Sequence, residues 1–140
     1  MLVVTATTLR ALSYERQKDA EILMQAQRWH AGYYLTGYAI ETAIKACIAK
    51  NVQAQTYPNK EFTNEAYQHK FRKLIVAAGL TVDFDKAYKD AEFFTFWLII
   101  DKWDVERRYD GRVTQGQAEA LYEAATHPKG FLPWIRNRWQ

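Results

Sequence analysis

The sequence predicts an all-α protein, an antiparallel up-and-down bundle of four to five helices formed by one domain over residues 1–140. Apolar residues recur at intervals of three and four through most of the chain, the spacing of one face of an α-helix. Alternating strands bounded by Gly and Pro do not occur, and neither does an internal repeat. The composition is 49% hydrophobic and 15% aromatic, enough for a buried core in 140 residues.

Two long helices are predicted in the N-terminal part. The first begins at a cap provided by Thr7 or Thr8 and runs to about Gln27. Its core face consists of Leu9, Leu12, Ala20 and Leu23. The second runs from Arg28 to about Lys50 without an interior proline, and we interpret it as a central helix that has neighbours on several sides.

The central helix carries two parallel stripes. The apolar stripe consists of Tyr33, Gly37, Ile40, Ile44 and Cys47, and the polar stripe consists of Tyr34, Tyr38, Glu41 and Lys45. Gly32 and Gly37 each cost about 1 kcal/mol in a helix relative to Ala. We therefore expect another backbone to pass close to them.

The remaining helices are shorter. A loop around Pro58 precedes a third helix from Ala66 to Ala78, which Gly79 terminates. A fourth helix is predicted from Phe84 to Lys102, although its run FFTFWLII alone could be a buried strand.

The C-terminal part contains one further predicted helix and a final turn. Thr114 and Gln117 are spaced as a capping box, so a fifth helix should begin at Gln115. The segment FLPWIRNRW forms a last turn or short helix, whose tryptophans pack the end of the chain onto the core.

Composition excludes several classes of site. Cys47 is the only cysteine, so neither an internal disulfide nor a cysteine zinc site is expected, and we interpret it as a core residue. The three histidines lie in separate segments without metal-ligand spacing, and no phosphate-binding glycine loop occurs; no metal and no cofactor are expected. The net charge of +3 is that of an ordinary surface.

No association with a membrane is expected. The N-terminal MLVVTATT lacks the features of a signal peptide, and FFTFWLII is too short to span a bilayer. The protein is therefore expected to be cytoplasmic.

Glu41 and Lys45 are the first candidate site residues. They stand four positions apart in the favourable order, and such a pair contributes roughly 0.2–0.5 kcal/mol when it is exposed. Their helix is too apolar for a surface helix. The pair therefore either closes on itself as a structural element or lines a functional groove or subunit interface.

A second candidate group is the basic cluster of Arg107, Arg108, Tyr109 and Arg112. Arginine forks suit phosphate, and a tyrosine ring stacks on a base. Acidic residues are interleaved with the cluster, so local salt bridges could instead neutralise it. His69 lies among lysines and an arginine, where it either orders the preceding loop or takes a catalytic role. Ser13, the only serine, has no adjacent histidine to activate it.

Several stretches together resemble the HEPN domain family. They are GYYLTGYAIETAIKACIAK, the block from Gln68 to Leu80, Trp103 followed by Arg108-Tyr109, and the ending GFLPWIRNRW. The resemblance implies a helical bundle that pairs into a symmetric homodimer. It also implies a minimal nucleotidyltransferase partner in a prokaryotic toxin–antitoxin or defence system, or a ribonuclease whose cleft lies at the dimer interface.

The chain departs from the ribonuclease members of that family. Those enzymes carry an arginine followed by a histidine, and no histidine follows Arg107, Arg108 or Arg112 at the required distance. Metal-independent cleavage needs a group that titrates near neutral pH. We therefore expect a non-catalytic module that binds RNA, a nucleotide or a nucleotidyltransferase partner.

Two alternatives remain open at the level of sequence. One is a divergent metal-independent ribonuclease toxin in which His69 or Tyr109 replaces the missing histidine. The other is a purely structural dimeric interaction protein, in which the rings of the central helix form the interface.

Overall fold

The computed structural model describes residues 4–52, 70–104 and 112–140. Within these ranges the chain forms seven α-helices and no β-strand. In chain order they are α1 (Ala6–Gln25), α2 (Trp29–Lys50), α3 (Phe71–Ala77), α4 (Thr81–Tyr88), α5 (Ala91–Ile100), α6 (Gln115–Thr126) and α7 (Phe131–Arg136). The prediction of an all-α bundle is confirmed.

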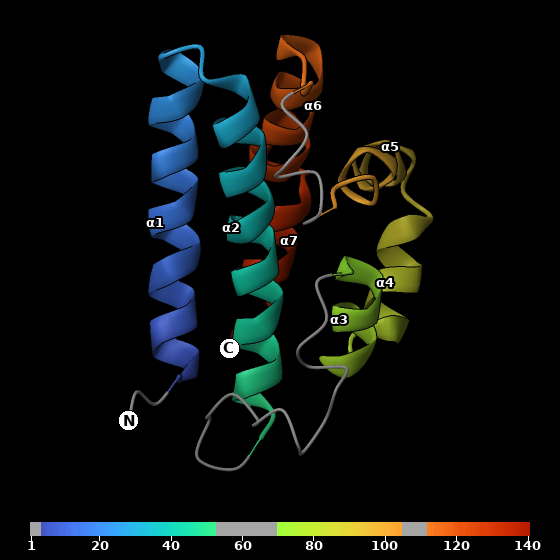
Figure 1. The fold of residues 1–140 in the computed structure, drawn as a ribbon. Helices are drawn as coiled ribbons and strands as arrows, with labels where there is room; N and C mark the ends of the chain where they lie inside the picture. Colours follow the sequence, from blue (N-terminus) through green and yellow to red (C-terminus); the bar gives the residue numbers. More distant parts are fainter. Residues whose placement is uncertain (1–3, 53–69, 105–111) are drawn as a thin grey trace.

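Helix α2 lies at the centre of this bundle (Figure 1). The two long helices α1 and α2 run antiparallel side by side, and α6 and α7 pack against α2 as well. The short helices α3, α4 and α5, coloured green to orange, form a group on the side of α2 away from α1 (Figure 1). The predicted central helix therefore has neighbours on several sides, and its predicted bounds are accurate.

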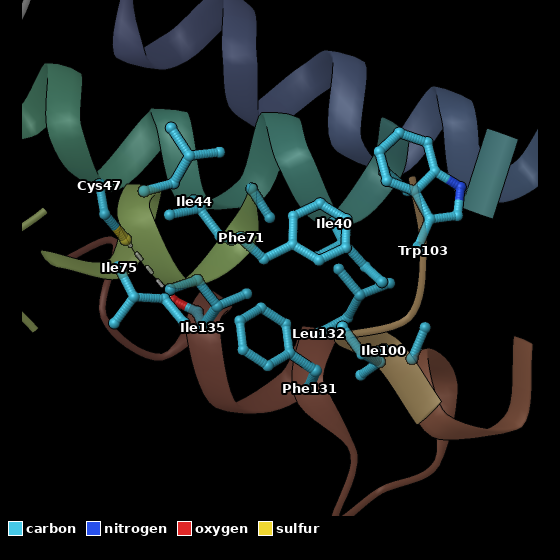
Figure 2. Packing of buried hydrophobic residues seen from close by; sticks show 14 of the residues in the cluster. Ile40, Ile44, Cys47, Phe71, Ile75, Ile100, Trp103, Phe131, Leu132 and Ile135 are labelled. Carbon is cyan, nitrogen blue, oxygen red and sulfur yellow. Dashed lines mark hydrogen bonds between the residues drawn. The ribbon is translucent and has the colours of Figure 1, made fainter. Parts of the chain in front are cut away.

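The amino acids of α2 suit that position. Of its 22 residues, 14 are buried, and four of these are alanines, which allow neighbouring helices to approach closely. A helix that is apolar on nearly all sides is one that the rest of the protein surrounds. Its apolar stripe is part of the hydrophobic core, where Ile40 and Ile44 pack beside Phe71, Ile75 and Ile135 (Figure 2).

Helix α1 begins and ends earlier than predicted. Its cap is Thr5, whose Oγ1 accepts a hydrogen bond of 3.1 Å from the backbone N–H of Thr8. At the other end the helix stops at Gln25, because Gln27 adopts a left-handed conformation with φ of 60° and turns the chain into α2. Of the predicted core face, Leu9 and Ala20 are buried, whereas the other two leucines are half-buried.

The prediction of one helix from Phe84 to Lys102 is wrong, because two helices, α4 and α5, occupy that range. The chain is extended at Asp90, whose Oδ1 accepts the backbone N–H groups of Glu92 and Phe93 at 3.0 Å each. This cap starts a new helix. The apolar period continues across the break because Phe84 and Trp97 pack against each other, with ring centroids 4.7 Å apart. The run FFTFWLII lies in α5, so it is not a strand.

Other helix boundaries were predicted more accurately. Gly79 ends the α3 region in the left-handed conformation, with φ of 73°. Helix α3 itself begins at Phe71, and the predicted start at Ala66 lies outside the described residues. The capping box before α6 is present, since Thr114 and Gln117 bond reciprocally at 3.1 and 2.9 Å.

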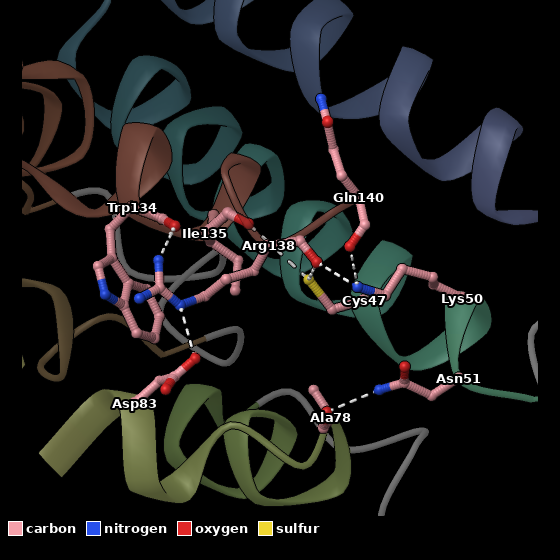
Figure 3. A network of polar contacts seen from close by, with 9 residues as sticks. All are labelled: Cys47, Lys50, Asn51, Ala78, Asp83, Trp134, Ile135, Arg138 and Gln140. Atoms are coloured by element: carbon pink, nitrogen blue, oxygen red, sulfur yellow. Dashed lines mark hydrogen bonds and ion pairs between the residues drawn. The ribbon is translucent and has the colours of Figure 1, made fainter. Parts of the chain in front are cut away.

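The end of the chain is fixed to the core, as the sequence predicts. The indole N–H of Trp139 donates to the carbonyl of Ala43 at 2.9 Å. Lys50 donates to the carbonyls of Arg138 and Gln140 at 2.7 Å each, and Arg138 forms an ion pair with Asp83 at 3.3 Å (Figure 3). These contacts join α7 to the C-terminal end of α2 and to α4.

Candidate functional site on helix α2

The polar stripe of α2 is the first candidate site, and the structure brings its two charges together. Lys45 Nζ lies 3.3 Å from Glu41 Oε2. Glu41 is only 5% exposed, and the side chain of Lys45 is 13% exposed. This burial distinguishes the pair from the solvated i, i+4 pairs of surface helices. A charge pair removed from water requires good geometry to offset the cost of desolvation.

An aromatic cluster covers the N-terminal part of the polar stripe, at Tyr34 and Tyr38. The ring of Trp103 stacks on Phe71, with centroids 5.2 Å apart and planes at 13°. Tyr38 and Tyr34 meet the same indole edge-on at 5.4 and 5.8 Å. Trp103 is 5% exposed, so this side of α2 is a closed aromatic layer formed by α2, α3 and the segment after α5.

The indole of Trp103 packs directly against Gly37, where the absence of a side chain leaves room for the ring. A Cβ atom at this residue would lie 2.0 Å from Cε2 of Trp103, too close for any side chain. The expectation that a backbone passes close to the glycines of α2 is therefore wrong at Gly37, where the neighbour is an aromatic ring. At Gly32 the Met24 residue of α1 lies close, and a Cβ atom would lie 2.8 Å from its Sδ and 3.7 Å from its backbone nitrogen.

A pocket lies at the N-terminal end of α2, at the head of the polar stripe. Its volume is about 310 Å³, and it is lined by Gln27, Arg28, Trp29, His30, Ala31 and Val113. Arg28 is exposed and occupies the cap position of α2 without a side-chain hydrogen bond to the helix. The His30 ring meets Tyr34 edge-on at 4.9 Å, which links the pocket to the stripe.

Electrostatics at this pocket favour an anion. The first turn of a helix presents backbone N–H groups and the positive end of the macrodipole. Arg28 adds a full positive charge, and Arg112, which is exposed, immediately precedes the lining residue Val113. Sequence reasoning did not identify Arg28 and His30 as site residues. The signal was present, because His30 extends the polar stripe by one step of four toward the N-terminus.

Of the other predicted site residues, only Arg112 lies within the ranges that the structure describes, and its side chain is exposed to solvent. His69, Arg107, Arg108 and Tyr109 lie outside the described residues, so their predicted roles stay predictions. Among the described residues, the structure therefore brings Glu41 and Lys45 together. Arg112 is the sequence neighbour of Val113, which lines the pocket at the N-terminal end of α2.

The potential nucleophiles among the described residues take part in packing. The hydroxyl of Ser13 is wholly buried and donates to the carbonyl of Ala39 at 2.8 Å. Burial raises the pKa of the Cys47 thiol to about 11, although Lys50, Arg10 and Arg138 act in the opposite direction. The thiol lies 3.9 Å from the carbonyl of Ile135 (Figure 2). The interpretation of Cys47 as a core residue is confirmed.

The described histidine outside the pocket joins two helices. His127 Nδ1 accepts the backbone N–H of Lys129 at 2.9 Å, and its Nε2 lies 3.6 Å from Glu92 on α5. The described ranges contain no group of three residues that could hold a metal ion. The same ranges contain no helix long and apolar enough to cross a membrane.

Comparisons of the chain with models of protein families, with curated proteins and with solved structures gave no match in any of the three.

Proposed function

We propose that this chain is a non-catalytic binding module of the HEPN type. It pairs into a symmetric dimer and binds RNA or a nucleotide, or a minimal nucleotidyltransferase partner, in a prokaryotic toxin–antitoxin or defence system. The observation that carries the proposal is the pocket at the N-terminal end of α2, which Arg28 and His30 line, and from which the contact of His30 with Tyr34 leads to the polar stripe.

The chemistry of the pocket favours a phosphate-bearing ligand over an uncharged one. A guanidinium binds phosphate through two parallel hydrogen bonds, and a helix N-terminus adds favourable potential. The pocket is a shallow depression open to solvent, with a volume of about 310 Å³. It suits one phosphate group with part of the molecule that carries it.

The state of the described nucleophiles favours binding over covalent catalysis. A thiol with a pKa of about 11 is protonated at neutral pH, and the Ser13 hydroxyl is wholly buried and donates to a backbone carbonyl. The alternative of a divergent ribonuclease depends on His69 and Tyr109, which lie outside the described residues.

Two single substitutions at the pocket test the proposal. Arg28→Ala and Arg112→Ala each remove an exposed guanidinium, and each should weaken binding about tenfold, the effect of losing a charge-assisted hydrogen bond. Isothermal titration with ATP and with a short single-stranded RNA measures the dissociation constants. Lys86→Ala is the matched control, because Lys86 is an exposed cation on α4.

The double variant Arg107→Ala with Arg108→Ala extends the test to the basic cluster, and it should abolish binding of the ligand or partner while fold and dimer persist. Light scattering measures the oligomer, and mass spectrometry of co-purified proteins identifies a nucleotidyltransferase. A monomeric wild-type protein that binds neither ligand and retains no partner would refute the proposal.

A cleavage assay separates the module from the ribonuclease alternative. Total RNA incubated with purified wild-type protein should stay intact. If it is cut, and a His69→Ala variant fails to cut it, the chain is a ribonuclease that uses His69.

A further inference from the structure

A second set of basic and aromatic side chains lies on α1 and α7. Arg10, Tyr14 and Lys18 recur at intervals of four along α1, and Arg136 on α7 lies over the ring of Tyr14. We refer to these four residues as the α1–α7 strip. Helix α1 lies on one side of α2, whereas α3, which contributes to the aromatic cluster at Trp103, lies on the other (Figure 1).

Arg136 is held in a fixed orientation against α1. One terminal nitrogen donates to Gln17 Oε1 at 2.6 Å, and the other donates to Ser13 Oγ at 3.1 Å. The guanidinium carbon then lies 3.9 Å from the centroid of the Tyr14 ring, so the cation covers one face of the phenol. An arginine fork that is already oriented loses little entropy when it binds.

The cations of the strip have no acidic partner among the described residues. No carboxylate lies within ion-pair distance of Arg10, Lys18 or Arg136. Two acids of α1 instead contact Arg16, which lies 3.6 Å from Glu15 and 3.2 Å from Asp19.

The side chain of Arg136 is also half-buried, so its charge is partly removed from water. Desolvation lowers the pKa of its guanidinium from the ordinary value. A buried cation without a counter-charge is costly, and a bound anion would remove much of that cost.

Tyr14 provides an open aromatic surface in the same place. It is 56% exposed although Arg136 covers one face and its edge meets Trp139 at 5.8 Å, so its remaining surface is open to solvent. Arg10 donates to the carbonyl of Trp139 at 2.7 Å and lies 5.9 Å from the centroid of its ring. Arginines and rings are thus interleaved at one patch of surface.

We propose that the α1–α7 strip binds a nucleotide unit, with the phosphate at its cations and the base stacked on the open surface of Tyr14. Arginine forks match phosphate oxygens, and an exposed aromatic ring stacks on any base. A simple carboxylate would use the cations but leave the ring uncovered. The strip shares no residue with the pocket of α2, so this site would stand even if α2 bound nothing.

Substitutions at two exposed residues, Tyr14 and Lys18, test the proposal and leave the hydrogen bonds from Arg136 to Gln17 and Ser13 in place. The probes are adenosine monophosphate, a short single-stranded oligoadenylate and an abasic strand of the same length. Tyr14→Ala should weaken binding of the oligoadenylate about tenfold, because base stacking is lost. It should leave the abasic strand unaffected. Lys18→Gln should reduce the slope of log Kobs against log salt by about 0.7, the effect of one lost phosphate contact.

Lys89→Gln is the control, because Lys89 is an exposed cation at the end of α4. Binding of both the mononucleotide and the strand would identify a free nucleotide as a sufficient ligand, and binding of the strand alone would identify single-stranded nucleic acid. The proposal fails if the wild type binds none of the base-containing probes. It also fails if Tyr14→Ala weakens the abasic strand equally, or if Lys89→Gln has the effect of Lys18→Gln. Tyr14→Ala should weaken oligoadenylate binding by the same factor in an Arg28→Ala background as in the wild type, so the two sites can be judged separately.

Discussion

The two stripes of α2 both contain buried residues but differ in what stabilises them. On the apolar stripe Ile40 and Ile44 are 0% exposed, and on the polar stripe Tyr34 and Glu41 are 5% exposed. The isoleucines pack against hydrophobic side chains of α3 and α7 (Figure 2). Their contribution to stability therefore depends on the apolar area that they bury and on how closely they pack. The polar stripe contains the charges of Glu41 and Lys45, and its stability depends on their geometry. Residues that are all nearly inaccessible to solvent therefore differ in how their substitution should affect stability.

The largest expected effect is at the polar stripe. Lys45→Met retains the aliphatic bulk and removes the cation that lies 3.3 Å from the buried Glu41 carboxylate. We expect the free energy of unfolding to fall by about 3 kcal/mol, the lower end of the cost of breaking a buried pair. Chemical denaturation monitored by tryptophan fluorescence measures it.

The second substitution of the pair shows whether charge is the cause. Glu41→Gln added to Lys45→Met removes the buried negative charge, so the double variant should regain much of the loss. Strictly additive losses would show that the polar stripe responds to substitution through packing alone, and the distinction between the stripes would disappear.

The apolar stripe should respond to alkaline pH through Cys47. Burial raises the pKa of its thiol from 9.0 to about 11, so the unfolded chain releases the proton first as pH rises. The stabilisation is fully present below pH 9 and is lost as pH rises through 11; it amounts to about 3 kcal/mol for two pKa units.

A cysteine-free variant isolates this effect from the other groups that titrate at alkaline pH. The stability of the wild type should fall more steeply between pH 9 and pH 11 than that of Cys47→Ala. Urea denaturation at several pH values provides the comparison. Parallel pH profiles would show that the thiol is not desolvated in the native protein.

Periodicity and capping explain which parts of the fold could be predicted. The bounds of α2 and the start of α6 follow from uninterrupted apolar spacing and from the box at Thr114 and Gln117. The break at Asp90 was missed because the apolar period of α4 continues in phase into α5, where one core receives Phe84 and Trp97. The start of α1 was misplaced because the sequence offers neighbouring threonines, and only Thr5 has the extended backbone of a cap.

The candidate site could be predicted only where its residues share one helix. Glu41 and Lys45 are four positions apart, so their contact follows from helical geometry alone. The pocket at the head of α2 joins Val113 to residues 27–31, and no local pattern indicates such a distant contact. The stacking of Arg136 on Tyr14 likewise depends on how α7 docks against α1.

The smallest of the three effects concerns Gly37, which lies on the apolar stripe and contacts the ring that covers the polar one. Gly37→Ala places a Cβ atom 2.0 Å from Trp103, so the indole must move, at a net cost of about 2 kcal/mol. Gly116→Ala in α6 is the matched control. Its Cβ would meet only Thr114 Oγ1 at 3.9 Å, so it should stabilise the protein by about 0.5 kcal/mol.

Thermal unfolding followed by circular dichroism compares the two glycine variants. Opposite signs would show that the contact with Trp103, and not helix propensity, requires glycine at position 37. Adding Trp103→Phe to Gly37→Ala should then recover part of the loss, because the smaller ring leaves room for the methyl group. If both alanines raise the melting temperature, the indole does not press on α2, and the closed aromatic layer over the polar stripe would be excluded.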